Sequence, residues 1–591
     1  MEYPEVSLPV VQRKIDDVQL FLSTALQIAN AHTVDFYTCN IWDRFLSVSP
    51  EDVLSQFSAS DVTSRGTLEG GTLENNFGFC HESGKLVDIG AFLEAAEHCS
   101  LPQLGISVPT EKLVEMFSDM ARHTQCIAVS EPDDFMNSKK AHEVQAMSAL
   151  VAFLAQHCRV KQVIDVGSGK GYLSSHLSMQ YRLQVFGIDS SSNNTHGAQE
   201  RNRKLKRYSR ANQKGKRWPR EREQLPKLAK EVQREDGKDM VTEERSPTHL
   251  QATQLNSEVT VDVNSHLQEP VECGVGNEYT DLFLGALSLN AVEPVCARVP
   301  PSQLSKEEKD RRMRENLDRK LREGRSNNSL FLPLTSYVTA ETELKDIIPE
   351  LENAVIVGLH TCGDLAPSTL RMFVGRQEIQ ATCSVGCCYH LLSEEFDQRR
   401  SDHTLNTGKT ETNSETRTEV FGFPMSKYLR DQTYICGRNA RMSACLAMER
   451  VTVGGGLPVE SLFYRAVLHV ILKDHYDAHK SEKRVGNVYS KTSSFVDYIR
   501  RALRKLELDE SKLSDEDIQA YHDQYKHRIC EMVAFNRLKV TLAPCIEGLI
   551  LLDRLCYLKE QENVSFAALV QLFDPLMSPR CYGLVALKIL A

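Results

Sequence analysis

The sequence predicts an α/β fold that is built around a Rossmann-like, mostly parallel sheet. Residues 138–200 read as helix, strand, glycine-rich turn, helix and strand, and such alternation is typical of parallel sheets. Further strand patterns follow at 353–360 (NAVIVGLH) and at 381–388 (ATCSVGCC). Two more, 567–573 and 584–590, flank a turn-rich stretch and suggest a hairpin. We therefore expect one sheet whose strands come from distant parts of the chain.

The composition limits the classes of protein that remain. The chain has 591 residues, of which 41% are hydrophobic and 25% charged, which is enough for several domains. A net charge of −10 argues against a surface that is basic throughout. We expect no signal peptide, because the first twenty residues carry charges throughout, and no membrane span. The 17 scattered cysteines fit reduced thiols, so we expect a cytoplasmic or nuclear location.

Shifts in composition and in apolar periodicity divide the chain into segments. Helical periodicity is clear in IDDVQLFLSTALQIANAH and EKLVEMFSDMARH, whereas the stretch RNRKLKRYSRANQKGKRWPR holds ten Lys or Arg and no acid. The expected segments are a helical N-terminal region (1–130), the first part of the sheet domain with the glycine turn (131–200), a charged and largely disordered insertion (201–327), the second part of the sheet domain (328–396), a polar linker (397–418), a helical subdomain (419–562) and the C-terminal hairpin (563–591).

The glycine turn is the clearest sign of a ligand. The buried strand pattern KQVIDV is followed directly by Gly167, Gly169 and Gly171. Glycines let the backbone turn tightly and let a ligand approach amides that a Cβ would shield. The next strand pattern, QVFGID, ends at Asp189, 18 residues after Gly171. An acid at this point can accept hydrogen bonds from two ribose hydroxyls.

Two ligands fit this outline, and the spacing favours one. A dinucleotide site needs G-x-G-x-x-G, but Tyr172 stands where its last glycine belongs, which argues against a nicotinamide oxidoreductase. Asp165 precedes the first glycine, where an acid repels phosphate and suits a ligand that carries an ammonium group. The pattern D-x-G-x-G-x-G resembles motif I of the class I methyltransferases, which bind S-adenosylmethionine. A turn whose glycines only ease packing is the alternative.

Further motifs extend this resemblance over the chain. The sequences MNSKKAHEV, GLHTCGDL, SVGCCYHLLS and FPMS occur in this order around the glycine turn. Together they resemble the methyltransferase-like protein twenty-five family, which has a relative named for a ribosomal RNA adenine dimethylase domain. The resemblance implies a seven-stranded class I methyltransferase sheet with S-adenosylmethionine as cofactor. In such a site Asp165, Gly167, Gly169 and Gly171 form the loop against the methionine part, and Asp189 holds the ribose.

Candidates for catalysis and substrate binding lie near the ligand end of the predicted sheet. Lys139 and Lys140 start the helix 142–157 and are predicted to meet the cofactor carboxylate or a substrate phosphate, or else form a solvated pair. His360 follows the fourth strand as a candidate base, and Asp364 would orient it, hold a substrate donor or cap the next helix. Amine methylators of nucleobases often carry an Asn/Asp-Pro-Pro-Tyr motif there, so His-Thr-Cys-Gly-Asp argues against adenine dimethylation.

Cysteines crowd the next strand end. Cys383, Cys387 and Cys388 belong to the fifth strand pattern, and Cys362 follows the fourth. Since these strands are adjacent in the expected fold, Cys362 should approach Cys387 or Cys388. The thiols would pack a tight strand end, bind zinc together with a histidine, or provide a nucleophile for cytosine methylation. No clean C-x-x-C pair supports a metal, so we expect packing and no metal site.

The regions outside the sheet are predicted to select the substrate. About 180 residues separate the fifth strand from the hairpin, and they leave the sheet beside the expected cofactor. We expect this helical subdomain and the N-terminal region to cover the active site, with Phe423, Pro424 and Met425 lining its entrance. The basic block 201–220 contains Tyr208 and Trp218, which could stack on bases, and is predicted to bind RNA, to direct nuclear import, or to be a solvated charge run.

The function that these observations predict is S-adenosylmethionine-dependent methyl transfer to RNA or to a translation-linked target. A protein substrate is the alternative within the same class. A binding scaffold that retains the cofactor fold without catalysis is the alternative in another class, because no familiar catalytic motif follows the fourth strand.

Overall fold

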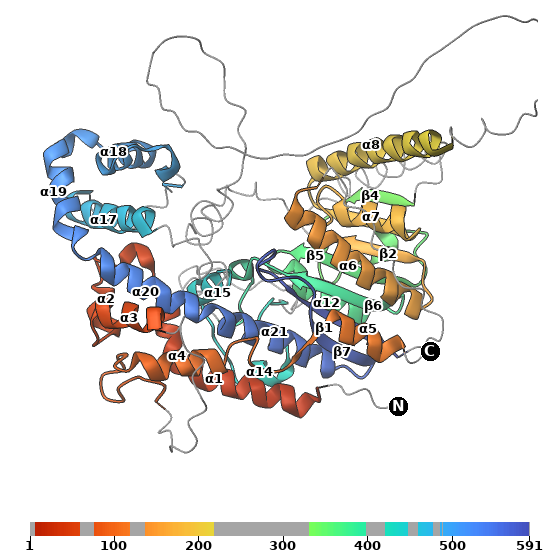
Figure 1. The fold of residues 1–591 in the computed structure, drawn as a ribbon, viewed down its shortest axis with the longest axis horizontal. Helices are drawn as coiled ribbons and strands as arrows, with labels where there is room; N and C mark the ends of the chain where they lie inside the picture. The colour runs from red at the N-terminus through yellow and green to blue at the C-terminus, as the bar shows by residue number, and fades with distance from the viewer. Residues whose placement is uncertain are drawn as a thin grey trace, which may run out of the picture. The chain divides into compact units, whose positions relative to one another are not determined.

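The computed structural model describes residues 6–59, 76–118, 136–217, 330–396, 420–446, 459–476, 485–486 and 488–589. The chain forms two compact units, Met1–Arg203 with Glu278–Ala591, and Lys204–Asn277. Of the second unit, only 204–217 is described, as the end of α8 (Ser192–Arg217). The predictions for 218–327 and for the linker 397–418 therefore fall outside the described residues, and Figure 1 draws these segments in grey.

The larger unit contains one eight-stranded sheet, which Figure 1 shows at the right, with α17–α20 at the left. The strands are β1 (Ser107–Pro109), β2 (Gln162–Val166), β3 (Gln184–Asp189), β4 (Phe331–Thr335), β5 (Ala354–Thr361), β6 (Ile379–Gly386), β7 (Val564–Gln571) and β8 (Tyr582–Lys588). Their order is β1-β7-β8-β6-β5-β2-β3-β4. All neighbours are parallel except that β8 runs antiparallel to both β6 and β7. This confirms the predicted hairpin, whose last strand inserts beside the fifth strand of the class I order; β1 is an addition, and neither β1 nor β4 was located from the sequence.

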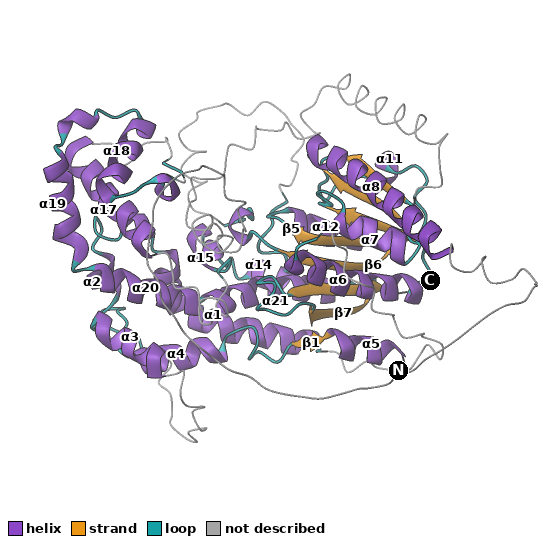
Figure 2. Ribbon diagram, turned by 45° about the horizontal axis from the view of Figure 1, so that its top comes forward, coloured by secondary structure: helices purple, strands orange, loops and turns teal. Residues whose placement is uncertain are grey.

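Helices cover both faces of the sheet, which explains why its strands are continuous apolar runs (Figure 2). Residues at alternate positions face opposite cores: Val163 lies in one cluster and Ile164 in the other. The helices on one face are α5 (Thr110–Ser118), α6 (Ser138–His157) and α7 (Tyr172–Gln180), and those on the other are α12 (Leu365–Gly375) and α21 (Ala543–Lys559). The predicted inner face of α6 is confirmed, since its apolar residues are all buried: Val144, Met147, Leu150, Val151 and Leu154.

The N-terminal helices and the late helices share one hydrophobic core, although the sequence suggested two separate regions. Helix α1 carries an apolar stripe, which would be exposed to water on an isolated helix. The stripe is buried here because α1 packs on α15 and α21. The helices of this part are α1 (Leu8–Asn30), α2 (Ile41–Phe45), α3 (Pro50–Ala59), α4 (Ile89–His98), α14 (Lys427–Asp431), α15 (Arg438–Ser443), α17 (Val459–Tyr476), α18 (Phe495–Leu506), α19 (Asp515–Lys526) and α20 (Ile529–Thr541). The short segments are α11 (Leu344–Ile347) and the 3-10 turns η1 (Thr33–Asp35), η2 (Tyr389–Leu391), η3 (Tyr489–Lys491) and η4 (Glu510–Lys512).

The late helices reach the sheet at two places. Helix α21 packs on β7 and β8, and α15 packs on η2, the turn that follows β6. Arg441 of α15 anchors this turn by donating hydrogen bonds to the carbonyl oxygens of Tyr389 and Leu392. Helices α17–α19 instead pack among themselves, on η1 and on α20. Helices α15 and α21, from the early and the last part of the predicted lid, therefore both adjoin the carboxyl end of β6, where a Cβ on Gly386 would lie 2.5 Å from Nη1 of Arg554 in α21. None of the helices described is both long and apolar enough to cross a bilayer.

Candidate functional site

The glycine turn joins β2 to α7 with a backbone that only glycine adopts readily. Gly167, Gly169 and Gly171 have φ angles of 73°, 54° and 68°. A Cβ at Gly171 would lie 2.7 Å from the ring of Phe331, so this glycine permits tight packing. A Cβ at Gly169 would meet no atom within 4 Å, so this part of the turn is open. The open backbone at Gly169 is where a ligand can approach.

Asp189 closes the turn from the end of β3. One of its carboxylate oxygens, Oδ2, accepts a hydrogen bond from the backbone N–H of Gly169 at 3.0 Å. The other, Oδ1, accepts from the N–H of Ser191 at 2.7 Å and from the side chain of Asn194 at 3.1 Å. The residue is half-buried, so its carboxylate remains partly accessible. The predicted ribose acid thus lies directly beside the open glycine.

Asp165 lies behind the turn and is 2% exposed. It accepts a hydrogen bond from the hydroxyl of Ser174 at 2.5 Å, which ties β2 to the first turns of α7. Burial raises the pKa of Asp165 to about 7, and the charge of Asp189 adds to the rise. Two carboxyl groups therefore border the turn, an environment that disfavours phosphate.

A buried carboxylate joins α6 to the end of β5. Glu143 is fully buried, and its Oε1 lies 3.0 Å from Nε2 of His360 and accepts a hydrogen bond from the hydroxyl of Ser578 at 2.8 Å. Its other oxygen is paired with Nζ of Lys140 at 2.8 Å. Burial alone would raise the pKa of Glu143, but the bonds and charges of His360 and Lys140 outweigh burial and lower it. His360 is thus held in one orientation.

The sequence reasoning missed Glu143, although a signal was present. Glu143 lies four residues before Met147 and seven before Leu150 on the inner face of α6, and an acid on such a face needs buried partners. Lys140, predicted as a cofactor or substrate ligand, makes its ion pair with this acid. Lys139 is half-buried and forms no ion pair with any residue that the structure describes. The substrate roles of both lysines stay predictions.

Asp364 does not cap the helix that follows it, and His360 is paired with Glu143 instead, so only the predicted role of Asp364 in holding a substrate donor stays a prediction. It stands at the N-cap position of α12, but its side chain accepts no bond from the helix. Its backbone already has right-handed helical angles, whereas a capping residue is usually extended. Oδ1 instead accepts from the N–H of Ser393 at 2.8 Å and ties the loops after β5 and β6 together. The role of His360 as a base remains a prediction.

The FPMS segment does not line an open entrance, which corrects the prediction for Phe423, Pro424 and Met425. All three residues are buried. The carboxylate of Asp553 in α21 accepts hydrogen bonds from the N–H groups of Met425 and Ser426 at 2.7 and 2.9 Å. The apolar side chains can enter the core because this carboxylate satisfies the backbone that accompanies them.

Three thiols meet at the carboxyl ends of β5 and β6, as the predicted strand order required. The sulfur of Cys362 lies 3.1 Å from that of Cys387, which lies 3.7 Å from that of Cys388. All three sulfur atoms lie within 4.8 Å of one another, and all three cysteines are free. Hydrogen bonds from Cys387 and Cys388 lower the pKa of Cys362. Cys383 differs, because it is fully buried in β6 and burial raises its pKa to about 12.

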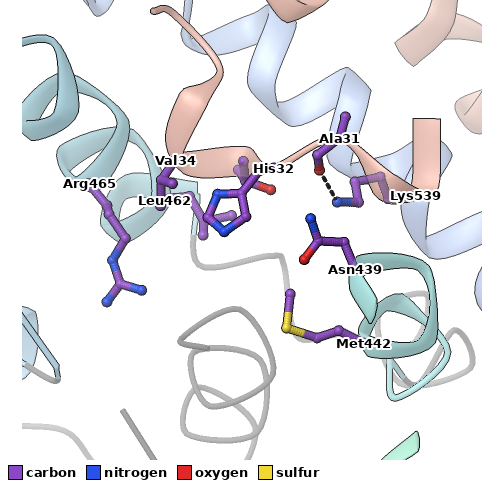
Figure 3. A pocket seen from close by; sticks show the side chains of 9 residues that line it. Ala31, His32, Val34, Asn439, Met442, Leu462, Arg465 and Lys539 are labelled. Carbon is purple, nitrogen blue, oxygen red and sulfur yellow. Dashed lines mark hydrogen bonds between the residues drawn. The ribbon is translucent and has the colours of Figure 1, made fainter. Parts of the chain in front are cut away.

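A separate pocket lies in the helical part and has no residue of the sheet or of the glycine turn in its wall (Figure 3). It is lined by Ala31, His32, Thr33, Val34, Asn439, Met442, Leu462, Arg465 and Lys539. Lys539 is buried and donates a hydrogen bond to the carbonyl oxygen of Ala31 at 2.7 Å. Burial lowers the pKa of Lys539 to about 7.

The predicted RNA-binding block lies partly within α8. Its first residue, Arg201, places its guanidinium over the ring of Tyr172, 4.1 Å from the centroid, beside the glycine turn. Arg203 pairs with Glu200 at 2.6 Å. The side chain of Tyr208 and the residues after 217 lie outside the described part, so RNA binding stays a prediction.

The strand order, the open glycine turn and the acid at the end of β3 define a class I methyltransferase fold. A family described as "Methyltransferase domain" matches residues 139–395. The chain is 47% identical over 601 residues to "Probable methyltransferase-like protein 25" of Mus musculus, covering 98% of this chain and 97% of the relative. It is 45% identical over 610 residues to the Homo sapiens protein of that name, covering 98% of each. The chain belongs to the methyltransferase-like protein 25 family. No solved structure matches it.

Proposed function

We propose that the chain transfers methyl groups from S-adenosylmethionine, which binds at the glycine turn. The observation that carries the proposal is the bond between Asp189 and the N–H of the open Gly169. A ligand above Gly169 has a carboxylate beside it that can accept hydrogen bonds from ribose hydroxyls. The carboxyl groups of Asp189 and Asp165 make the turn unsuited to pyrophosphate, and a cationic ligand nearby would favour the charged form of Asp165, whose pKa burial raises to about 7. When bound, the cofactor supplies an activated methyl group.

Binding of S-adenosylhomocysteine, measured by calorimetry, tests this proposal without any knowledge of the acceptor. Gly169→Arg should abolish binding, because its side chain fills the open space, and Asp189→Ala should weaken it at least tenfold. Gly105→Arg is the matched control, since exposed Gly105 also has a positive φ, of 67°, and a Cβ there also meets no atom within 4 Å. Preferential binding of NAD would contradict the proposal.

The acceptor is a separate question, and RNA and protein are its two proposed classes. The basic run that begins at Arg201, within α8, supports RNA, because Arg201 lies beside Tyr172 at the glycine turn. A protein acceptor is the alternative. Labelled cofactor, incubated with the protein and with separated RNA and protein fractions, distinguishes them, and Gly169→Arg provides the blank. Cofactor binding without label in any fraction would favour a binding scaffold without catalysis.

A further inference from the structure

The three-thiol cluster, Cys362 with Cys387 and Cys388, is a built feature of two adjacent strand ends. In the sheet, Thr361 of β5 pairs with Gly386 of β6. The next residues, Cys362 and Cys387, therefore follow the two strands at neighbouring positions on the same edge of the sheet. The N–H of Cys387 donates to the carbonyl oxygen of Thr361 at 3.1 Å, which fixes the two ends together. The cluster therefore rests on the sheet rather than on a free loop.

The backbone at the cluster is unusual in a way that gathers the sulfur atoms. Consecutive side chains of a regular strand point to opposite faces, yet the sulfurs of Cys387 and Cys388 lie 3.7 Å apart. Cys388 has a φ of 31°, and His360, two residues before Cys362, has a φ of 63°. Left-handed angles are uncommon for residues other than glycine, and they concentrate at ligand sites and active sites.

We propose that Cys362, Cys387 and Cys388 bind a zinc ion and that an external thiol occupies its fourth position. Zinc takes thiolates at about 2.3 Å in tetrahedral geometry, which sets the sulfur atoms about 3.8 Å apart. The observed separations of 3.1 and 3.7 Å need only small adjustments. Within the described residues, no fourth ligand atom lies within 4.8 Å of all three sulfurs. Three protein ligands and one open position are typical of catalytic zinc.

The surroundings suit an anionic zinc centre with one accessible side. Zinc with three thiolates has a net charge of −1, and the buried guanidinium of Arg554 is close enough to Cys387 for their charges to interact. A Cβ on Gly386, just before Cys387, would lie 2.5 Å from Nη1 of Arg554. Cys362 is exposed, so an external ligand can reach the open position. A thiol that binds zinc loses its proton and becomes a thiolate nucleophile.

A zinc-bound thiol would also be the acceptor class for methyl transfer, and this step rests on the function proposed above. A Cβ on Gly167 would lie 3.1 Å from Cδ2 of Leu365, so the start of α12, three residues after Cys362, packs against the glycine turn. The zinc-bound thiolate would form a sulfur–carbon bond with the methyl group and become a neutral thioether. The donor's methyl–sulfur bond would break with its electron pair left on the donor sulfur, and the thiol proton would pass to solvent.

Metal content tests the site independently of methylation. Full-length reduced protein, purified with zinc and without chelator, should carry one equivalent of zinc, and the Cys387→Ser/Cys388→Ser variant should carry none. Cys39→Ser is the matched control, because Cys39 is exposed and far from the cluster in sequence. Circular dichroism should show that each variant is folded. Zinc-free wild-type protein, or a Cys362–Cys387 disulfide in its place, would overturn the inference.

Two measurements test the open position. Cys445 lies 3.6 Å from His390 near the cluster, so Cys445→Ser should retain zinc; loss of zinc would mean a closed four-ligand site and would contradict an open one. In cobalt-substituted protein, 2-mercaptoethanol should shift the visible absorption bands, and ethylene glycol should not. Unchanged bands with the thiol would overturn the open position.

Methylation assays then separate this inference from the proposed function. Labelled cofactor is incubated with the protein and, in separate assays, with a small free thiol or with a protein fraction. Label should appear on the free thiol or on protein cysteines, and this tells which of the two supplies the thiol. Label confined to RNA would overturn the thiol acceptor. If S-adenosylhomocysteine binds and zinc does not, the inference fails while the proposed function stands. If zinc binds and S-adenosylhomocysteine does not, the proposed function fails.

Discussion

Nε2 of His360 lies 3.0 Å from Oε1 of Glu143, which links the carboxyl end of β5 to the helix that covers it. The carboxylate is fully buried and also holds Lys140 and Ser578. Because Ser578 lies between β7 and β8, this acid connects an early helix, the middle of the sheet and the final hairpin. It acts as a buried junction of the catalytic domain.

Replacement of Glu143 should destabilise the fold strongly. Glu143→Ala leaves three buried or half-buried donors without their acceptor, and breaking such a buried pair typically costs about 3–5 kcal/mol. Glu143→Gln keeps the shape and some of the hydrogen bonds, so its cost should be smaller. Urea denaturation measures both, with Glu94→Ala in α4 as the control, because Glu94 is exposed. Equal stability of Glu143→Ala and Glu94→Ala would contradict the proposed junction.

The final strand should be indispensable. β8 lies between β6 and β7, so removal of 577–591 separates β7 and its neighbour β1 from the other strands and also deletes Ser578. We expect this truncated chain to be insoluble or to lack a cooperative unfolding transition in circular dichroism. Removal of 589–591 alone is the control, because Ile589 is 60% exposed and lies after β8. A cooperative, native-like melt of the longer truncation would show that the domain does not depend on β8.

Much of the sheet was predictable because doubly covered strands are apolar runs that stand out from their surroundings. The same strand order predicted that Cys362 would approach Cys387 or Cys388. The three residues of β1 left no comparable pattern. The pairing of Glu143 with His360 joins distant parts of the chain and depends on how α6 lies on the sheet.

The wrong predictions concern residues whose partners come from other elements. Asp364 looked like a cap for the next helix, but its carboxylate accepts a hydrogen bond from Ser393, in the loop after β6, instead. Phe423 and Met425 looked like an entrance because the segment leaves the sheet near the expected cofactor. Asp553, more than a hundred residues later, accepts the hydrogen bonds that let this segment become buried. The residues next to Asp364 and to the FPMS segment in the sequence do not indicate that Ser393 and Asp553 are their partners.

The FPMS segment should therefore affect stability before it affects substrate choice. Met425 is 3% exposed, so Met425→Ala removes buried contacts and should cost about 2–5 kcal/mol. Leu20→Ala is the control, because Leu20 is 50% exposed and should change stability by less than about 1 kcal/mol. Urea denaturation measures both variants. A Met425→Ala protein with unchanged stability and lowered methylation would restore the entrance role that the burial argues against.

The buried Lys539 should make stability depend on pH. Its pKa is lowered to about 7 in the folded protein, compared with 10.5 in an unfolded chain. Between these values the unfolded chain holds a proton that the folded protein has lost, so this lysine makes stability rise as the pH increases. The full difference corresponds to at most about 5 kcal/mol. Below pH 7 the burial of the charged lysine costs most, and this cost disappears as the pH rises towards 10.5.

Urea denaturation at pH 7 and at about pH 9 measures this dependence. Lys539→Met keeps a similar volume and removes the charge, so the variant should gain most over the wild type at pH 7 and less at pH 9. At each pH, the free energy of unfolding of the wild type is subtracted from that of Lys539→Met, because other groups that titrate in this range affect both proteins equally. Lys526→Met, an exposed change at the end of α19, should give a difference that does not vary with pH. If the Lys539→Met difference were equally constant, folding would not lower the pKa of Lys539, and the prediction would be wrong.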